Sequence, residues 1–260
     1  MIYFLGHADY LVVSRFLGTT NLGFYEFSYR IPHLVRWRFS QPLSSVLFPV
    51  LVKSKDLSRS LYGVYTVIKI NAIVSSIILL FLAVFSREII LFLWGEKWLK
   101  IVTLLIIASI GALIECIISV RNSIFLAFER PDLNFKSNFL HAFLTIILLL
   151  FLTPKFGLQG AALAVLLGLT VPVFYFVYSL KILNGKIFDL LPFFFLLITG
   201  ILIISFILKI FIFPFLQNFN FYLGFILVGF LYLILTFFFV FKVFSSFIKE
   251  VLVLLKESFR

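Results

Sequence analysis

Long apolar stretches recur from one end of this 260-residue chain to the other, and each is followed by a short polar segment. A helix needs about 20 apolar residues to cross the hydrocarbon core of a bilayer, within a range of roughly 17–25. The pattern therefore predicts an all-α, polytopic bundle of about eight membrane spans. The predicted spans are Ile2–Leu17, Phe24–Leu51, Leu61–Phe85, Leu99–Phe128, Phe139–Leu152, Leu158–Leu183, Leu190–Phe213 and Phe221–Phe244.

Two further segments are too short or too charged to span. Glu88–Trp94 follows the third span and predicts a short interfacial piece. Phe247–Arg260 has apolar residues at helical spacing beside lysine and arginine, which is typical of a helix that lies on the membrane surface. The loops between spans are short, as in Gly18–Gly23, so no soluble domain is expected between them.

Composition agrees with a membrane protein and excludes several other classes. Hydrophobic residues make up 63% and charged residues 13% of the chain, against roughly 45–50% and about 25% in soluble domains. Most of the 37 phenylalanines are expected at lipid-facing positions. The net charge of +11 comes from residues that flank helices, so no nucleic-acid partner is expected. With Cys116 the single cysteine, neither disulfides nor a cysteine metal cluster is expected.

Lysine and arginine residues divide unevenly between the two sides of the predicted membrane. Loops richer in these residues tend to face the cytoplasm. One side holds eleven, namely Lys53, Lys55, Arg59, Arg130, Lys136, Lys181, Lys186, Lys242, Lys249, Lys256 and Arg260. The other side holds five, namely Arg87, Lys97, Lys100, Lys155 and Lys209. Both termini are therefore predicted to lie on the cytoplasmic side of the inner (cytoplasmic) membrane.

The second predicted span carries a polar face. Glu26, Arg30, His33, Trp37 and Gln41 follow at intervals of four, three, four and four residues, which places them on one side of a helix. Glu26 and Arg30 stand at i and i+4, in the favourable order for an ion pair. This face is the strongest candidate for a functional surface.

Other features of the same span support a cavity-lining role. Arg36 and Arg38 widen the basic face toward the cytoplasmic half. Pro32, Pro42 and Pro49 each remove a backbone donor, so the helix is expected to bend. Bent helices are common in transporters, where they line a cavity or rock.

The first span is short and interrupted by charge. Asp9 and Arg15 are six residues apart, about 600° of helical turn, so they point in different directions and need partners on other helices. The span begins at Met1 with neither a basic flank nor a small-residue cleavage site, so a signal peptide is not expected. Its shortness predicts that upstream residues are missing, through truncation, a late start or a split protein.

These charges have two interpretations. A charge at mid-membrane costs about 2.5–3.5 kcal/mol on insertion scales, so it normally faces a bundle interior or a hydrated cavity. The charges either pair with one another and hold helices together, or line a cationic cavity for an anion such as a lipid-linked diphosphate. The candidate substrate-binding residues are Arg15, Arg30, Arg36 and Arg38. The candidate ion-pair or coupling-ion residues are Asp9 and Glu26.

Elsewhere the sequence predicts structural roles. Glu115 and Arg121 on the fourth span are expected to pair between helices, and the small residues from Gly157 to Gly168 predict close helix packing. There is no Walker loop, H-E-x-x-H, nucleophile elbow or dinucleotide fingerprint. No catalytic residue, metal or cofactor is therefore predicted, and the chain is not expected to be an enzyme.

Seven short segments, taken in order and spacing, resemble a known family. They are DYLVVSRFLG (9–18), LGFY (22–25), YR (29–30), VLFP (46–49), GEKW (95–98), LAFERPD (126–132) and FGLQG (156–160). They are similar to the Wzx-type polysaccharide flippases of the multidrug/oligosaccharidyl-lipid/polysaccharide exporter superfamily. The resemblance extends from residue 1 to about residue 185, and the last two spans agree in hydropathy alone.

The resemblance implies two six-helix lobes around a central cavity, often with two extra C-terminal helices. It also implies movement of undecaprenyl-diphosphate-linked oligosaccharide to the outer leaflet for surface polysaccharide, such as lipopolysaccharide, by alternating access. Residues 1–184 then correspond to the second lobe and residues 185–260 to two additional helices with an amphipathic cytoplasmic tail. The first lobe is absent. Partners implied are the bilayer, lipid-linked oligosaccharide, a separately encoded N-terminal lobe and polysaccharide polymerase machinery.

Three alternatives stay open at this point. A multidrug exporter lobe of the same superfamily would favour a cavity dominated by carboxylates. A membrane-embedded enzyme of glycan assembly would place clustered acidic residues or histidines at a membrane face, and none is evident in the sequence. A non-transporting fragment or partner subunit would be separated from a flippase by gene context alone.

Overall fold

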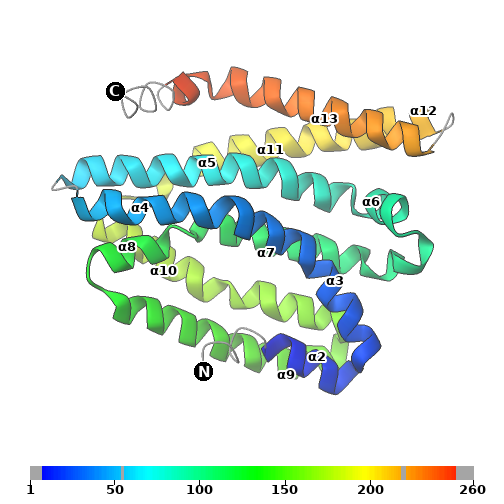
Figure 1. The fold of residues 1–260 in the computed structure, drawn as a ribbon, viewed down its shortest axis with the longest axis horizontal. Helices are drawn as coiled ribbons and strands as arrows, with labels where there is room; N and C mark the ends of the chain where they lie inside the picture. Colours follow the sequence, from blue (N-terminus) through cyan, green and yellow to red (C-terminus); the bar gives the residue numbers. More distant parts are fainter. Residues whose placement is uncertain (1–7, 54–55, 218–220, 250–260) are drawn as a thin grey trace. The chain divides into compact units, whose positions relative to one another are not determined.

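Every regular element that the structure describes is a helix (Figure 1). The computed structural model describes residues 8–53, 56–217 and 221–249. The α-helices are α2 (Ala8–Leu17), α3 (Thr19–Val35), α4 (Gln41–Lys53), α5 (Leu57–Val84), α6 (Ser86–Leu93), α7 (Val102–Ile118), α8 (Arg121–Ala127), α9 (Pro131–Gly168), α10 (Thr170–Ile182), α11 (Leu191–Ile207), α12 (Phe213–Gln217) and α13 (Phe221–Val243). Two π-helices, η1 (Arg36–Ser40) and η4 (Leu208–Ile212), and two 3-10 helices, η2 (Glu96–Ile101) and η3 (Ile187–Asp189), join them. The predicted all-α class is confirmed.

Five of these helical segments are long and apolar enough to cross a membrane. They are Leu57–Val84, Glu96–Ala127, Pro131–Ile182, Ile187–Leu216 and Phe221–Val243. The chain is therefore a multi-pass membrane protein. The count differs from the predicted eight because Pro131–Ile182 contains two predicted spans, and because the two opening spans carry charges and consist of shorter helices.

The second predicted span is continuous from α3 through η1 to α4, but its winding changes at Arg36. The N–H of Gln41 donates to the carbonyl of Arg36, five residues back instead of four. Pro42 follows at once, and a proline has no N–H and crowds the carbonyl four residues before it. A π-turn ahead of the proline relieves this crowding. Figure 1 shows α3 and α4 as one bent rod, as the prolines predict.

The helix α9 consists of two parts that meet at Gly157. The backbone there has φ 59° and ψ −138°, outside the helical region, in a conformation that glycine adopts without a Cβ clash. A Cβ atom added to Gly168, in the second part, would overlap Thr145 Oγ1 in the first. The two parts therefore pack against each other, and the predicted face of small residues is buried, including Gly160 and Ala164.

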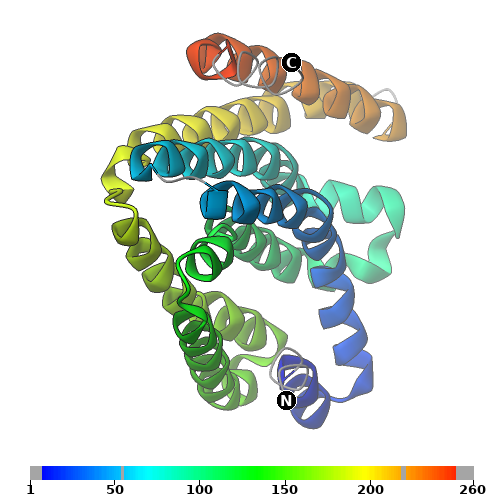
Figure 2. The ribbon, with the colours of Figure 1, turned by 60° about the vertical axis from the view of Figure 1, so that its left-hand side comes forward.

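The chain divides into two compact units, Met1–Leu191 and Pro192–Arg260. In the first unit α5 packs along α7, and both helices bury aliphatic side chains such as Ile68 and Leu104. Figure 2 shows α2 beside α9, at the edge of this unit. Within a bilayer such contacts stabilise the bundle through van der Waals packing, because lipid is as apolar as the side chains.

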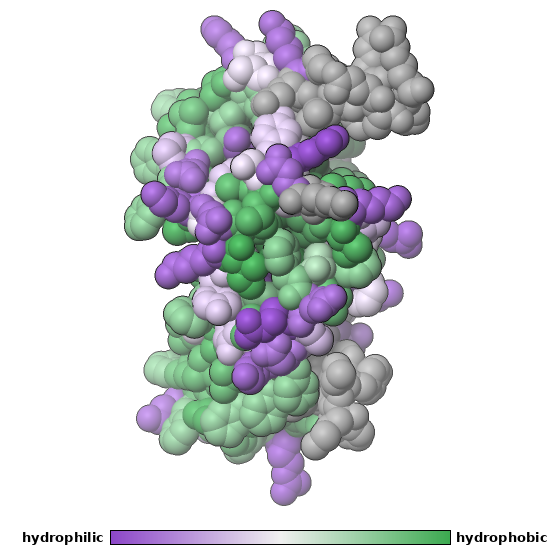
Figure 3. All heavy atoms as spheres, turned by 90° about the vertical axis from the view of Figure 1, so that its left-hand side faces the viewer, coloured by the Kyte–Doolittle hydropathy of each residue, from purple (hydrophilic) through white to green (hydrophobic). Residues whose placement is uncertain are grey.

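One end of the first unit is rich in basic residues. Its helix ends and loops on the left of Figure 1 carry hydrophilic side chains, which gather on the face shown in Figure 3. The exposed basic residues in these segments are Lys53, Arg59, Arg130, Lys136, Lys181 and Lys186. They belong to the set of loops for which the sequence predicted the cytoplasmic side.

The second unit contains most of α11, η4, α12 and α13, and exposes many aromatic side chains. Phe195 and Phe211 are 73% and 72% exposed, as expected for phenylalanines that face lipid. The π-helix η4 again lies just before a proline, Pro214. The part of the predicted tail beyond Lys249, like residues 1–7 of the first predicted span, lies outside the described residues.

Candidate functional site

A groove of about 340 Å³ runs along the polar face of α3. Glu26, Arg30, His33 and Trp37, four members of the predicted face, line it together with Tyr10 of α2 and Leu34. Glu26, Arg30 and Trp37 are exposed. Gln41, the fifth member, does not line the groove because the π-turn of η1 shifts the helical register before it is reached. The periodicity of the sequence therefore places four of the five side chains correctly.

Glu26 and Arg30 share this groove without pairing. The ion pairs between described residues are Arg36–Glu115, Arg130–Asp132 and Lys136–Asp132, and the predicted Glu26–Arg30 pair is not among them. Both charged groups are instead open to the groove. An exposed arginine with its donors unused can bind an anion without first breaking an ion pair.

Asp9 anchors the first helix to the second. Tyr25, which is fully buried, donates its hydroxyl to Asp9 Oδ2 over 3.1 Å. The Tyr25 ring also packs edge-on against Tyr10 and lies tilted against Tyr29. Tyr25 is therefore a partner on another helix of the kind that the sequence required for Asp9.

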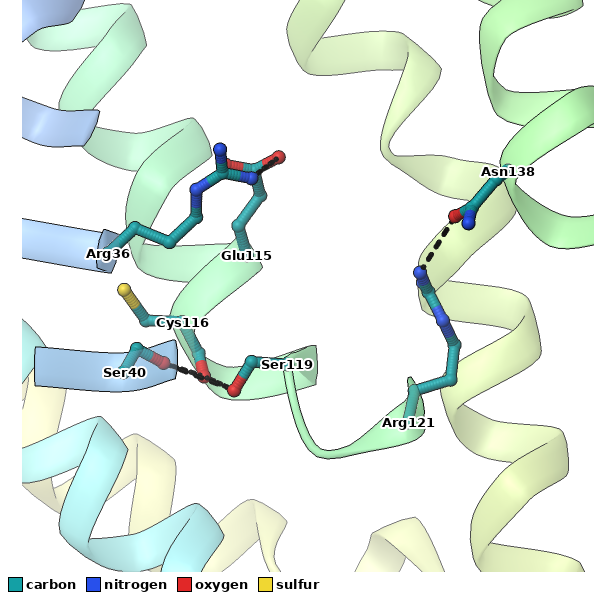
Figure 4. A network of polar contacts seen from close by, with 7 residues as sticks. All are labelled: Arg36, Ser40, Glu115, Cys116, Ser119, Arg121 and Asn138. Atoms are coloured by element: carbon teal, nitrogen blue, oxygen red, sulfur yellow. Dashed lines mark hydrogen bonds and ion pairs between the residues drawn. The ribbon is translucent and has the colours of Figure 1, made fainter. Parts of the chain in front are cut away.

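Arg36 forms the principal ion pair of the site (Figure 4). Its Nη1 lies 3.2 Å from Oε1 of Glu115, and the two side chains are 27% and 24% exposed. The pair joins η1 to α7, so Glu115 makes the interhelical pair that the sequence predicted. Arg36 was predicted as a substrate-binding residue, and the structure shows that a carboxylate already holds it.

The other two candidate arginines lie apart from the groove. Arg15 is exposed in the last turn of α2, and Arg38 is exposed on η1. Neither residue lines the groove. Of the four candidate arginines, the structure therefore brings only Arg30 into the groove itself.

A small chamber lies behind the groove, between α3, α7 and α9. It holds about 30 Å³, and its polar lining residues are Tyr29, His33 and Glu115. Small and aliphatic residues of α7 and α9, such as Gly111 and Leu166, form most of the rest of its wall. His33 lines both the groove and the chamber. The chamber is large enough for a water molecule, which needs roughly 10–15 Å³.

Sequence reasoning missed a buried cluster of serines that fastens the π-turn to the bundle. Ser119 Oγ lies 3.1 Å from Ser40 Oγ and 2.6 Å from Ser44 Oγ. Asn71 of α5 donates to Ser119 over 3.2 Å, and Ser123 donates to the Ser44 carbonyl over 2.7 Å. The signal was present, because serines at i and i+4 on two helices are typical of close polar packing in membranes.

Arg121 ties three helices together. This side chain is only 7% exposed; its Nη1 donates to the Pro172 carbonyl over 3.1 Å, and its Nη2 lies 3.4 Å from Asn138 Oδ1 (Figure 4). The residue therefore connects α8 with α9 and α10. Arg121 pairs between helices as the sequence predicted, although its partners are neutral oxygens and not Glu115.

The described residues contain no group of three or more histidine, cysteine, aspartate or glutamate side chains placed to hold a metal ion. The site contains an exposed arginine in a groove, a second arginine paired with a carboxylate, and a chamber lined by residues of α3, α7 and α9. This arrangement can bind an anion and exchange protons.

Comparisons with known proteins agree on the kind of molecule. A sequence family described as polysaccharide biosynthesis protein matches residues 1–103. The chain is 28% identical over 158 residues to the lipopolysaccharide biosynthesis protein WzxC of Escherichia coli, covering 60% of this chain and 32% of WzxC. It is 27% identical over 176 residues to the probable low-salt glycan biosynthesis flippase Agl15 of Haloferax volcanii, covering 65% of this chain and 36% of Agl15.

A solved structure shares the fold. The inward closed conformation of the lipid II flippase MurJ aligns with a TM-score of 0.72 at 22% sequence identity, covering 94% of this chain and 53% of the MurJ chain. The chain spans about a third of the length of WzxC and Agl15. It corresponds to one part of such proteins.

Proposed function

We propose that this chain, a relative of the Wzx-type polysaccharide flippases as its sequence predicts, is one lobe of a transporter for undecaprenyl-diphosphate-linked oligosaccharide. The names of Agl15 and MurJ describe flippases, and the family match and WzxC name polysaccharide or lipopolysaccharide biosynthesis. These relatives point to a transporter and not to an enzyme. A lipid-linked glycan has a polar headgroup that needs a hydrated path and a lipid tail that stays in the bilayer.

The observation that carries this proposal is the groove on α3. The groove is open and contains an arginine that forms no ion pair with another described residue. A charge of this kind on a helix of a membrane bundle calls for a hydrated surface, because lipid excludes charge. Arginine keeps its charge when partly desolvated, and its planar fork matches phosphate oxygens. Arg30 is therefore assigned the first contact with the diphosphate.

The remaining candidates receive roles that follow from their positions. Arg36 is a second diphosphate contact, available once it leaves Glu115. Arg15 and Arg38 are exposed and serve as contacts outside the groove. Glu26 lies one helical turn from Arg30 in the lining of the groove and lowers the positive potential there, while Asp9 fixes α2 through Tyr25. Asp9 and Glu26 are also the candidates for holding a coupling ion.

A groove on one lobe becomes a closed path only when a second wall faces it. We assign residues 1–184 to a six-helix C-terminal lobe and residues 185–260 to two additional helices with a cytoplasmic tail. The opposite wall comes from an N-terminal lobe, encoded separately or upstream, and the polysaccharide polymerase machinery receives the product. The excess of basic residues on one set of loops supports the inner membrane with both termini cytoplasmic.

The test is replacement of Arg30 by alanine in the cell that carries this gene. Loss of a charge-assisted hydrogen bond costs about 1.5–3 kcal/mol, and a tenfold change corresponds to about 1.4 kcal/mol. Surface polysaccharide is expected to fall roughly tenfold or more, while lipid-linked oligosaccharide accumulates in the inner leaflet. Both are measured by labelling the glycan and by extracting lipids.

The matched control is Arg59→Ala, since Arg59 is exposed on α5 and lies outside the groove. Immunoblots of membranes show that both variants are present at the level of the unmodified protein. Normal export by the Arg30→Ala variant would remove Arg30 from the mechanism. Normal export after deletion of the whole gene would remove the chain from this function.

A further inference from the structure

The ion pair between Arg36 and Glu115 is largely buried but keeps some contact with solvent. Both side chains are about three-quarters buried, and each is the other's ion-pair partner among the described residues. Nη1 is the Arg36 nitrogen that bonds to Glu115, and Nε is buried without a partner. Removing one member of a buried pair leaves the other as an uncompensated charge, which is strongly unfavourable.

Among the described groups around Glu115, Arg36 is the cation that forms an ion pair with it. From α3, Tyr29 and His33 face it across the chamber. From α8, Arg121 acts on it electrostatically without forming an ion pair, and Cys116 is its neighbour on α7. The residues of α9 that line the chamber are aliphatic, and His141 of α9 acts electrostatically on Arg36 and Arg121 without lining the chamber. If Arg36 turns away, no second cation within 4 Å replaces it among the described residues.

The chamber gives Glu115 a route to the groove. His33 lines the groove on one side and the chamber on the other, and Glu115 lines the chamber. The chamber has room for a water molecule between them. Histidine is suited to pass protons near neutral pH because it can gain and lose a proton there.

We propose that Glu115 is a proton-binding site, and that an anionic diphosphate headgroup which takes Arg36 from Glu115 is accompanied by one proton that binds the freed carboxylate. The inference rests on the proposed function, because it needs a diphosphate that reaches Arg36. A hydronium ion in the groove gives a proton to one nitrogen of His33 and becomes water, the other nitrogen releases its proton into the chamber, and that proton forms an O–H bond on Glu115. The N–H bonds made and broken on His33 cancel, so the net change is one O–H bond broken in the groove and one formed on Glu115.

The sign of the coupling follows from linkage. A carboxylate left in a poorly hydrated site without its cation is unfavourable, and a proton removes the charge. The complex with diphosphate therefore holds more protons than the free lobe, so diphosphate binding strengthens as the pH falls. When the diphosphate leaves, Arg36 returns to Glu115 and the proton is released.

The experiment measures protons taken up when the purified full chain, in detergent, binds farnesyl diphosphate. A pH indicator in weakly buffered solution reports the protons, and equilibrium dialysis reports the bound diphosphate. Wild type is expected to take up about one proton per diphosphate more than Glu115→Gln, whose side chain cannot be protonated. The Glu115→Gln variant also corrects for protons taken up by the diphosphate itself. The matched control Glu96→Gln, at an exposed position on η2, is expected to behave as wild type.

Two further readouts separate proton binding from a structural role. On binding of farnesyl diphosphate, the infrared carbonyl band of a protonated carboxylic acid is expected in wild type and absent in Glu115→Gln. In stopped-flow mixing, His33→Asn is expected to slow proton uptake without changing the final number of protons. A merely structural Glu115 would produce neither result.

The outcomes distinguish this inference from the proposed function. Failure of the wild-type chain to bind farnesyl diphosphate in preference to farnesol would overturn the proposed function, and the inference with it. Tight binding with the same proton uptake in wild type and Glu115→Gln would overturn the inference alone. A carboxylic acid band that persists in Glu115→Gln would assign the proton to another residue.

Discussion

In the described part of the first compact unit, many polar side chains bond from one helix to another, whereas in the described part of the second unit polar side chains bond mainly within their own helix. Arg36 meets Glu115 between η1 and α7, and Ser119 of the α7–α8 junction meets serines of η1 and α4. In the second unit, Thr199 donates to the Phe195 carbonyl and Thr236 to the Tyr232 carbonyl, four residues back in each case.

The difference shows what each unit needs from its polar groups. A hydroxyl that bonds to its own helix satisfies its donor in lipid but does not determine which helices pack beside it. A hydroxyl or guanidinium that bonds across helices fixes which helices meet and in what register. The unit that holds the groove is fixed in this second way, while the second unit relies mostly on aromatic packing.

In the second unit, Gly200 of α11 and the ring of Phe239 on α13 pack closely together. A Cβ atom added to Gly200 of α11 would overlap the ring of Phe239 on α13. Phe193 of α11 likewise packs on Phe244, with ring centroids 4.6 Å apart. Shape complementarity between a ring and a glycine therefore joins these helices, and Ser205 of α11 also hydrogen-bonds with Tyr232 of α13.

The largest stability effect in this comparison is expected for Ser119→Ala. The change removes contacts with Ser40, Ser44 and Asn71 at once. Hydrogen bonds between membrane helices average about 0.6 kcal/mol each, so the free energy of unfolding should fall by about 2 kcal/mol. The measurement is unfolding by sodium dodecyl sulfate in mixed micelles, followed by circular dichroism.

The control for this variant is Ser45→Ala, one position beyond Ser44. Ser45 is exposed and donates to the Pro42 carbonyl of its own helix. Its loss should change the free energy of unfolding by less than about 0.5 kcal/mol. Equal losses for the two variants would contradict the claim that polar contacts across helices hold the first unit.

The sequence predicted the groove but not its connection to α7. Glu26, Arg30, His33 and Trp37 could be placed because helical periodicity depends only on local spacing. The partner of Arg36 is 79 residues away, and its choice depends on how α7 packs. Local spacing carries no information about that packing.

The end of the polar face shows the same limit at shorter range. Gln41 was predicted beside Trp37, but the π-turn of η1 adds a residue to one turn and changes the register. Pro42 is the cause, and it was recognised as a source of bending. The sequence does not determine whether a proline is accommodated by a kink or by a π-turn, because both relieve the same clash.

A smaller effect is expected for Gly200→Ala, which sharpens the comparison from the side of the second unit. The new methyl group would overlap the Phe239 ring, and the ring must move away. Overpacking of this kind costs roughly 1–3 kcal/mol, and the low end is expected because the tip of a ring can shift. Relative to the Gly63→Ala variant described below, the free energy of unfolding should be lower by about 1 kcal/mol in the same detergent titration.

The matched control is Gly63→Ala in α5, where an added Cβ meets no atom within 4 Å. Both changes gain the same helix propensity, about 0.8–1.0 kcal/mol, so the difference between them isolates the overlap with the ring. A Gly200→Ala variant as stable as Gly63→Ala would show that the ring does not hold α11 against α13.

The smallest effect is expected for Thr236→Val, which tests the second unit in the way that Ser119→Ala tests the first. Thr236 is 1% exposed, and its hydroxyl bonds to the carbonyls of Tyr232 and Leu233 on the same helix. Valine keeps the shape, and those carbonyls belong to the helical ladder. The free energy of unfolding should therefore change by less than about 0.5 kcal/mol in the same titration. A loss as large as that of Ser119→Ala would mean that this hydroxyl also acts between helices, because removing a bond confined to α13 leaves the contact between helices intact.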